Sequence, residues 1–212
     1  MKEEKRNIPE VRFREFAGDN ADAWELRKLY EYASFTKGNG LSWKDISDDG
    51  NQECILYGNL YTEYGMITDK VIYKTNSKVK SPVYSKYGDI LIPSSDTTPT
   101  GLAKATSLEK TGILLGGDIN VIRPNDGING SCLSLAINVN KKSLLRLITG
   151  ITVRHIRNSD IRKIDISLPG DLLEQDKIVS IFKYLDSLIT LHQRELDDLK
   201  VLKKTLLSKM FV

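Results

Sequence analysis

The sequence "PGDLLEQDKIVSIFKYLDSLITLHQRELDDLKVLKKTLLSKMFV", residues 169–212, predicts one long uninterrupted helix. Asp171 precedes Glu174 by three residues, a capping-box spacing in which each side chain can satisfy a backbone N–H at a helix start. Beyond Asp171 the sequence contains no proline or glycine. At about 1.5 Å per residue such a helix reaches roughly 60 Å, which is longer than a small domain is wide. We therefore expect a rod that leaves the globular part of the chain.

Apolar residues recur along this segment at heptad spacing, and apolar rows flank the central row on both sides. A face this broad is stable when other helices cover it, so the pattern predicts assembly. His192 falls in the central row, where we interpret it as a core or partly solvated histidine without chemistry. The positions assigned to helix packing are Ile178, Phe182, Leu185, Ile189, Leu196, Leu199, Leu202 and Leu206.

Charge and composition favour a domain with an appended helix. The helical segment carries seven basic and seven acidic residues, so the whole net charge of +3 resides in the residues before it. That excess permits nucleic-acid binding without requiring it, because strongly electrostatic binders are far more basic. Hydrophobic residues make up 40% of the 212 residues, which is enough for a core.

Cysteine usage and the N-terminus indicate the compartment. Cys54 and Cys132 lie far apart and outside any metal-ligand spacing, which predicts two buried thiols in a reducing cytosol. The N-terminal "MKEEKRNIPE" is charged and has no apolar segment, so no signal peptide is expected. No stretch approaches the length needed to cross a bilayer. We expect a soluble, cytoplasmic protein.

The fold class predicted is α+β, with a mixed, mainly β head over residues 1–168 followed by the helical region over residues 169–212. Short strands broken by turn residues are expected in residues 53–62, 65–73, 88–93 and 116–124. The alternation in "SCLSLAINV", residues 131–139, predicts a further strand. A final strand should place Ile164, Ile166 and Leu168 on one face.

Four shorter segments complete the head. Residues 8–16 should be extended, and the capping spacing of Asp22 and Glu25 predicts a short helix over residues 24–33. A polar loop over residues 93–112 contains a helical turn near Pro99. A second short helix is expected over residues 141–150, closed by Gly150.

Motifs for catalysis are absent from the sequence. It contains neither a phosphate-binding G-x-x-x-x-G-K-[ST] loop nor a G-x-G-x-x-G turn, and no G-x-S-x-G elbow. His155 and His192 are not in a zinc-like spacing with cysteines or carboxylates. We therefore infer no catalysis, no metal and no cofactor in this chain.

Three polar loops form the expected recognition face, residues 34–40, 56–65 and 93–101. They are rich in Asn, Ser, Thr, Tyr, Lys and Gly, whose side chains donate and accept hydrogen bonds at short range, as base edges and phosphates require. Ordinary soluble proteins have loops of similar composition, so each loop alone is weak evidence.

Six stretches run in order along nearly the whole chain: "IPEVRFREF", "WELRKL", "GDILIPSS", "LLGGDINVIRP", "GITVRHIRNSDIRKIDISLP" and "EQDKIVSIFKYLDSLITLHQRELDDLKVLKKTLLSKMF". Together they resemble half of the specificity (S) subunit of a type I DNA restriction-modification system. The last stretch is the most specific, because "LP" and "EQ" before "LD" and "LI", running on to "LKKTLLSKMF", are typical of the conserved helical region of that family.

This resemblance implies a target-recognition domain that reads a half-site of duplex DNA, with the helix as spacer and docking surface for methyltransferase (M) subunits. Full-length members carry two such units whose helices pack as an antiparallel coiled coil. This chain has one, so it is either a natural half-subunit that homodimerises through the helix or a fragment of a tandem subunit. The terminal "KMFV" favours the natural half-subunit, and a twofold dimer would read a symmetric, interrupted site. The resemblance also implies restriction (R) subunits as partners, with S-adenosylmethionine and ATP bound by the partner subunits.

Base contacts do not transfer between members of this family, so the candidate contacts rest on side-chain chemistry. The candidates for base or phosphate contact are Lys37, Asn39, Tyr57, Asn59, Tyr61, Thr62, Ser94, Ser95, Thr97, Thr98 and Thr100. The candidates for backbone phosphates are Lys78, Lys80, Lys86 and Arg154.

One competing function stays open and another is disfavoured. A structural oligomerisation or adaptor protein would use the same helix for assembly and its head to bind protein, which the modest net charge favours. A self-sufficient DNA methyltransferase would need a cofactor-binding glycine turn and an Asn/Asp-Pro-Pro-aromatic motif, and the sequence has neither.

Overall fold

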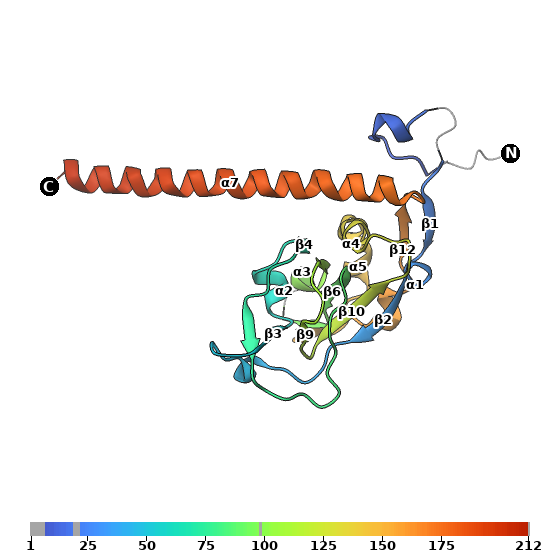
Figure 1. Cartoon of the computed structure of the whole chain (residues 1–212), viewed down its shortest axis with the longest axis horizontal. Coiled ribbons are helices and arrows are strands. Elements are labelled where there is room, and N and C mark those ends of the chain that lie inside the picture. The colour runs from blue at the N-terminus through green and yellow to red at the C-terminus, as the bar shows by residue number, and fades with distance from the viewer. Residues whose placement is uncertain (1–6, 19–21, 98, 212) are drawn as a thin grey trace. The chain divides into compact units, whose positions relative to one another are not determined.

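A computed structural model describes residues 7–18, 22–97 and 99–211 of the chain (Figure 1). The chain consists of two compact units, Met1–Gln175 and Asp176–Val212. We call the first the head. The long helix α7, Leu172–Met210, begins in the head and makes up nearly all of the second unit. The α+β class predicted from the sequence is confirmed, as is the long C-terminal helix.

A five-stranded sheet with the order β2-β10-β6-β8-β4 forms the centre of the head. Its strands are Ala33–Lys37, Ile119–Pro124, Asp89–Pro93, Thr106–Leu108 and Ile67–Thr68, in that order. β4 runs parallel to β8, and the other neighbours are antiparallel. All five residues of β6 are buried, so both of its faces are covered and its sequence is a nearly continuous apolar run.

A second sheet, with the order β5-β3-β9, packs beside the first. It contains Tyr73–Thr75, Gln52–Ile55 and Leu114–Leu115. The main hydrophobic core joins both sheets, because Leu91 and Val121 of the five-stranded sheet share one buried cluster with Ile55 and Leu115. Leu60 and Tyr64, in and after helix α2 (Asn59–Thr62), complete this cluster. Cys54 and Cys132 are both buried free thiols, as predicted.

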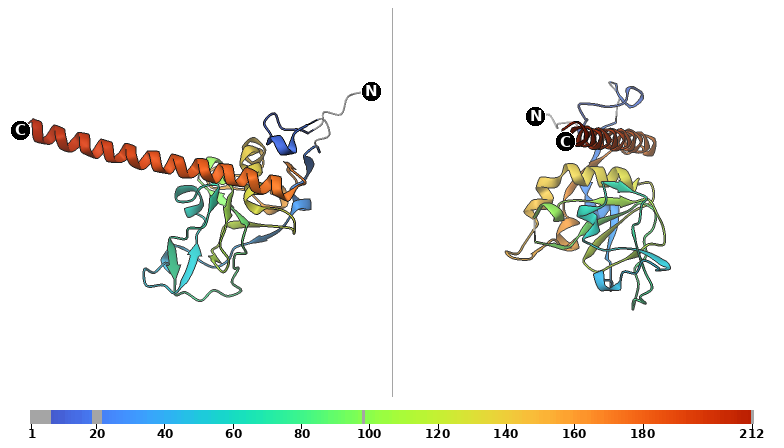
Figure 2. Two further views of the ribbon diagram at one scale, coloured as in Figure 1. Left: turned by 45° about the horizontal axis from the view of Figure 1, so that its top comes forward. Right: turned by 90° about the vertical axis from the view of Figure 1, so that its left-hand side faces the viewer.

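Smaller elements close the edges of the head (Figure 2). Strand β1, Glu25–Lys28, pairs with β12, Asp165–Leu168, and β7, Ser95–Asp96, pairs with β11, Arg154–His155. The remaining short helices are η1 Arg14–Phe16, α1 Leu29–Tyr32, η2 Trp43–Asp45, α3 Pro99–Leu102, α5 Lys141–Arg146 and α6 Asn158–Ile161.

Residues 131–139 do not form the predicted strand: they lie in the helix α4, Gly130–Val139. The Asn129 side chain caps this helix by accepting hydrogen bonds from the N–H groups of Ser131 and Cys132, at 2.9 and 3.0 Å. α4 packs on β6, β8, β10 and β12 and is buried on most sides. An almost fully buried helix shows no amphipathic period, so its alternation of small polar and apolar residues resembled a strand.

A close backbone contact fixes the start of α4. A Cβ atom added at Gly130 would lie 2.0 Å from the carbonyl oxygen of Gly88, the residue before β6. Glycine is therefore required at this position, because any other side chain would push the helix away from the sheet.

Other local predictions met with mixed outcomes. The helix expected over residues 24–33 is instead β1, α1 and the first residue of β2, because tertiary strand pairing overrides the local pattern. The strand expected over residues 53–62 ends at Ile55, and residues 14–16 form η1. The helix expected over residues 141–150 ends at Arg146. The strands at residues 88–93 and 116–124, the turn at Pro99 and the buried face of the last strand are confirmed.

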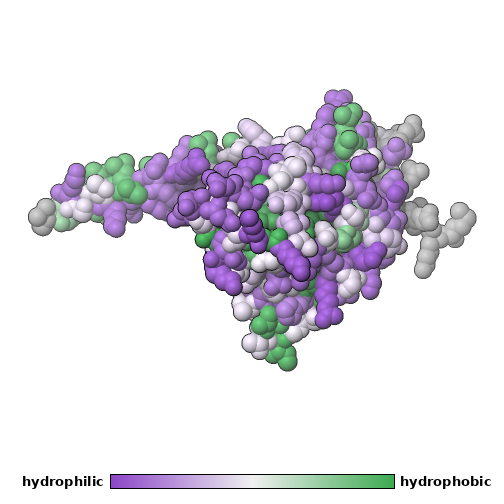
Figure 3. Space-filling model, turned by 60° about the horizontal axis from the view of Figure 1, so that its bottom comes forward, coloured by the Kyte–Doolittle hydropathy of each residue, from purple (hydrophilic) through white to green (hydrophobic). Residues whose placement is uncertain are grey.

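α7 is uninterrupted over 39 residues. Asp171 caps it by accepting a hydrogen bond from the backbone N–H of Leu173 at 2.8 Å. In the second unit, the described residues from Ser180 to Phe211 include no buried side chain, and the side chains of Leu185 and Leu199 are 45% and 62% exposed. Figure 3 shows hydrophobic atoms interspersed with hydrophilic ones towards the C-terminal tip. His192 is exposed beside Glu195. Antiparallel packing of α7 against another helix stays a prediction. None of the described helices is both long and apolar enough to cross a membrane.

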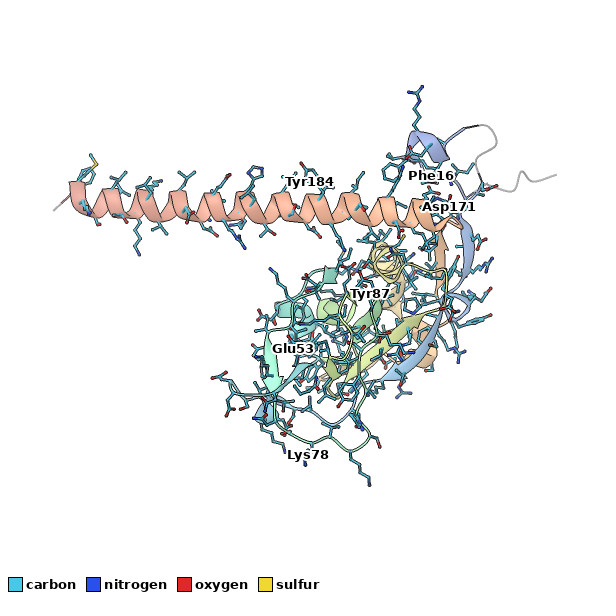
Figure 4. The ribbon with its side chains drawn as sticks, viewed as in Figure 1. Phe16, Glu53, Lys78, Tyr87, Asp171 and Tyr184 are labelled. Atoms are coloured by element: carbon cyan, nitrogen blue, oxygen red, sulfur yellow. The ribbon has the colours of Figure 1, made fainter. Side chains whose placement is uncertain are left out.

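The predicted capping box at the start of α7 forms only in part, because Glu174 bonds elsewhere. Its carboxylate, 1% exposed, accepts two hydrogen bonds from the Arg12 guanidinium, each 2.7 Å long. The indole N–H of Trp24 donates to the same carboxylate at 3.2 Å. The hydrogen bond to Glu174 raises the pKa of Arg12 further above its ordinary value. The first turn of α7, near Asp171 in Figure 4, is therefore tied to the N-terminal segment of the head.

Replacing Arg12 with Met should lower the free energy of unfolding by about 3–5 kcal/mol, because Glu174 then stays buried without its cation. Urea denaturation of the full chain measures this change. The double variant Arg12→Met/Glu174→Met should recover most of the loss. Arg27→Met is the matched control, since the Arg27–Glu25 pair is 47% and 43% exposed and exposed pairs contribute about 1 kcal/mol or less. If Arg12→Met and Arg27→Met lower the free energy of unfolding equally, the Arg12–Glu174 pair does not have the stabilising role assigned to it.

Candidate nucleic-acid interface

Three strands of the five-stranded sheet meet a polar hollow at one edge of the head. β2 ends at Lys37, β6 ends just before Ser94, and β10 carries Asn120 opposite Lys37. The hollow has a volume of about 310 Å³. We call it the strand-end hollow, and its lining is Lys37, Ser94, Asn120, His155, Ile156, Arg157 and Asn158.

Hydrogen bonds hold residues 154–158 against the end of β6. The N–H of Ile156 donates to the carbonyl oxygen of Ser94 at 3.0 Å, and the side-chain amide of Asn120 donates to the carbonyl oxygen of Ile156 at 3.0 Å. The side-chain amide of Asn158 donates to the carbonyl oxygen of Thr36 in β2 at 2.7 Å. The walls of the hollow are therefore fixed by bonds between distant parts of the sequence.

Asp118 lies beside this hollow and bonds to two of its lining residues. Its carboxylate accepts hydrogen bonds from the Lys37 ammonium and from the Ser94 hydroxyl, both at 3.2 Å. The Lys37 and Asp118 side chains are 54% and 51% exposed, so water screens the pair and it contributes about 1 kcal/mol or less. Asp118 has φ +58°, a left-handed conformation that few residues other than Gly, Asn and Asp adopt. The Lys37 ammonium and the Asp118 carboxylate therefore hold each other in place while both face solvent.

A second hollow, of about 410 Å³, lies between Asn39 and residues 77–81, which we call the 77–81 loop. The side-chain amide of Asn39 donates to the carbonyl oxygens of Lys80 and Ser81, at 2.9 and 3.2 Å. Asn39 thereby positions the loop. Lys78 and Lys80 are exposed and make no ion pair with any described residue, and Figure 4 shows Lys78 extending from the outer end of the loop.

The aromatic candidates gather on and beside α2. The rings of Tyr57 and Tyr61 lie 6.4 Å apart with an edge-to-face arrangement. Burial, and then the nearby Asp96, raise the pKa of Tyr61 above its ordinary value, so its phenol stays neutral and can donate. The Thr62 hydroxyl is occupied by the carbonyl oxygen of Gly58 at 3.1 Å.

Asn59 lies in the core rather than on the recognition face, since it is only 1% exposed. Its side-chain oxygen accepts a hydrogen bond from the buried N–H of Leu56 at 3.0 Å. This bond closes the turn between β3 and α2. Because Asn59 is buried and bonded to the backbone, its role is structural.

The segment after β6 joins the strand-end hollow to the aromatic candidates. Ser95 and Asp96 pair with His155 and Arg154 across β7 and β11, and the N–H of Thr97 donates to the Asp96 carboxylate at 2.6 Å. Thr100 lies in α3, and Thr98 lies outside the described residues. The Nε of Arg154 is buried and has no hydrogen-bond partner among the described residues.

The candidates do not all share one surface. Lys86 lies before the start of β6, at the opposite end of this strand from Ser94. It lines a different hollow, of about 420 Å³, together with Arg123. Asp89 is fully buried at this end of β6, and its carboxylate accepts two hydrogen bonds from the Arg123 guanidinium, at 2.8 and 2.6 Å.

Six residues that line or border the strand-end hollow were not among the candidates: Asp118, Asn120, His155, Ile156, Arg157 and Asn158. A charge count would have indicated part of this region. Residues 141–163 contain seven lysines or arginines and one acidic residue, a local excess larger than the +3 of the whole chain. Asp118 and Asn120 carry no such signal, because only strand pairing places them beside Lys37.

The chemistry of this face is that of recognition. Hydroxyl, amide, ammonium, guanidinium and carboxylate groups offer hydrogen-bond donors and acceptors together. Among the described residues, no group of three or more His, Cys, Asp or Glu side chains could hold a metal ion. The arrangement can bind a polar, extended ligand across the edge of the sheet.

Comparisons with known proteins point to one family. The chain matches the family model described as type I restriction modification DNA specificity domain over residues 21–201. Its fold is similar to the S subunit of a type I restriction-modification system from M. genitalium, with a TM-score of 0.58 and 16% identity over 80% of this chain and 40% of that one. The HsdS subunit from Thermoanaerobacter tengcongensis gives 0.55 and 17% over 84% and 42%. A chain from a type I R-M system gives 0.56 and 18% over 84% and 43%.

The chain therefore spans less than half the length of each of these solved proteins. No curated protein matches its sequence significantly.

Replacing Asn59 with Ala should destabilise the head by about 1–3 kcal/mol, because the N–H of Leu56 is then buried without an acceptor. Thermal or urea unfolding measures the change. Thr62→Ala is the matched control in the same helix, and its exposed position predicts an effect within about 0.5 kcal/mol. A stable Asn59→Ala variant that loses ligand binding would instead make Asn59 a contact residue.

Proposed function

Because the chain belongs to the type I restriction-modification DNA specificity family, as its sequence motifs predicted, we propose that it is a non-catalytic unit that reads a half-site of duplex DNA. The observation that carries this proposal is the family match over residues 21–201, which includes most of the head and most of α7. A DNA-recognition role also agrees with the face at the edge of the sheet, where exposed donors and acceptors surround two hollows.

The lysines of the 77–81 loop suit phosphate contacts. Lys78 and Lys80 are exposed, their loop is held by Asn39, and no described acidic residue pairs with either of them. Phosphate contacts set the register of a protein on duplex DNA, whereas base contacts give sequence preference. We assign the 77–81 loop to phosphate contacts.

The helix provides the docking surface in this proposal. Seven of the eight residues assigned to packing are exposed, and Ile178 is half-buried. A helix with such a face is stabilised when another helix covers it. We propose that a second copy of this chain, or a second half-subunit, packs antiparallel on it, and that methyltransferase subunits dock on the resulting pair. In the assembled system the methyltransferase and restriction subunits would bind S-adenosylmethionine and ATP, and this chain would bind neither.

Replacing both Lys78 and Lys80 with Ala should weaken binding to duplex DNA of every sequence by a similar factor. Each lost phosphate contact should also reduce the slope of log K against log [salt] by about 1. Fluorescence anisotropy with labelled duplexes across a salt series measures both quantities, and Lys86→Ala, measured separately, tests whether the far end of β6 contributes.

A protein-binding adaptor would keep its affinity for its target and show no salt slope for DNA in any of these variants. The modest net charge of +3 is the observation that keeps this second function open. Sequence-independent binding by the wild-type chain together with its methyltransferase partner, at moderate salt, would contradict the proposed function.

Leu185→Asp and Leu199→Asp should convert the assembled protein to monomers, because a carboxylate buried in a helix seam costs on the order of 3 kcal/mol or more. Sedimentation velocity measures the oligomeric state. Ser187→Asp, on the polar side of the same helix, is the matched control and should leave assembly unchanged. If all three variants keep the sedimentation coefficient of the assembled wild-type protein, Leu185 and Leu199 do not lie in the interface.

A further inference from the structure

The strand-end hollow brings donors together with an acceptor that hydrogen bonds hold in place, the Asp118 carboxylate, which distinguishes it from the 77–81 loop. Lys37 and Arg157 supply donors, and Ser94 supplies a hydroxyl that donates or accepts. Asp118 supplies a half-exposed carboxylate, an acceptor only. A phosphate group is itself an acceptor with negative charge, so the Asp118 carboxylate opposes phosphate binding at this point.

Base edges in the major groove have the complementary chemistry. Cytosine and adenine present amino donors there, whereas guanine and thymine present acceptors. A carboxylate next to an ammonium therefore matches neighbouring bases better than it matches the sugar-phosphate backbone. The same pattern explains why Lys37 is here beside an acidic partner while Lys78 and Lys80 have none among the described residues.

The acceptor is preorganised. The Asp118 backbone is held at φ +58° by the turn before β10, and its carbonyl oxygen accepts the N–H of Ser94 at 2.8 Å. Its carboxylate is oriented by the Lys37 ammonium and the Ser94 hydroxyl. In the wall of the hollow, the side-chain oxygen of Asn158 is buried and has no hydrogen-bond partner among the described residues. Groups held in advance lose less entropy when a ligand arrives.

Resting on the proposed function, we propose that Asp118, with Lys37 and Ser94, reads base edges in the major groove and determines part of the DNA sequence preference. Asp118 accepts a hydrogen bond from the amino group of cytosine or adenine. Lys37 donates to an acceptor on a neighbouring base, and Ser94 holds the carboxylate at the correct angle.

Asp118→Asn is the sharpest test, because asparagine has the same shape and tolerates the left-handed backbone. It replaces one carboxylate oxygen with an amide that donates. The experiment selects from a randomised duplex DNA library with the full-length chain and its methyltransferase partner, then sequences the bound fraction. We expect one position of the selected motif to change from a base with an amino group to one with an acceptor, or to lose its preference by about 5- to 150-fold.

Two further variants keep the test independent of folding defects. Lys37→Met removes the donor and should relax a position next to the one that Asp118 reads. Glu53→Gln removes a carboxylate from another partly exposed ion pair, Lys110–Glu53. Glu53 lies on β3 (Figure 4), and this change should leave the motif unchanged. Circular dichroism melting curves identify any variant that fails to fold.

Three outcomes would overturn the inference. If the wild-type chain selects no motif, the proposed function fails and the inference falls with it. A motif that the folded Asp118→Asn and Lys37→Met variants select unaltered leaves the proposed function standing and removes only the inference. A uniform rise in affinity for all sequences in Asp118→Asn, with a steeper salt slope, would show that the hollow binds phosphate.

Discussion

The buried carboxylate of Glu174 is the junction on which the head depends. Its charge is neutralised by the Arg12 guanidinium through two hydrogen bonds, and Trp24 adds a third. The next residue, Gln175, is fully buried, accepts the N–H of Asn129 at 2.8 Å and donates to the carbonyl oxygen of Pro169 at 2.9 Å. The first turn of α7 thus joins the N-terminal segment, the cap of α4 and the end of β12. Three stretches of sequence far apart are organised around two side chains.

The two ends of β6 illustrate how one strand separates structure from recognition. At its start, Asp89 is fully buried and bound by Arg123, whose side chain is 28% exposed, so that ion pair is mostly buried and structural. At its end, Asp118 and Lys37 form a looser pair that is half exposed beside a hollow. The buried strand between them keeps the two pairs at a fixed separation. Groups that face solvent in fixed positions are the ones available to a ligand.

The sequence was most informative where a pattern is long or continuous. Seven-residue periodicity over α7 and the apolar runs of β6 and β10 predicted these elements, because each follows from burial of a regular face. α4 was misassigned because a helix buried on most sides has no polar face to reveal its period. Loop composition named Lys37 and Ser94 as candidates for base or phosphate contact, and the structure places both at the strand-end hollow. Residues 155–158 were not named as candidates. The pairing of β11 with β7 brings them to the hollow from a distant part of the sequence, and the local charge count marks only part of this region. Asn59 had suitable chemistry, but its burial removes it from the surface.

The left-handed backbone of Asp118 restricts which amino acids this turn accepts. Glycine, asparagine and aspartate adopt such a conformation readily, whereas β-branched and bulky residues are strained there. The position therefore accepts few kinds of side chain: a carboxylate, an amide or, in glycine, none. Substitution at this one site can vary hydrogen-bonding character but cannot add a bulky side chain, so larger groups must come from neighbouring residues with ordinary backbone angles.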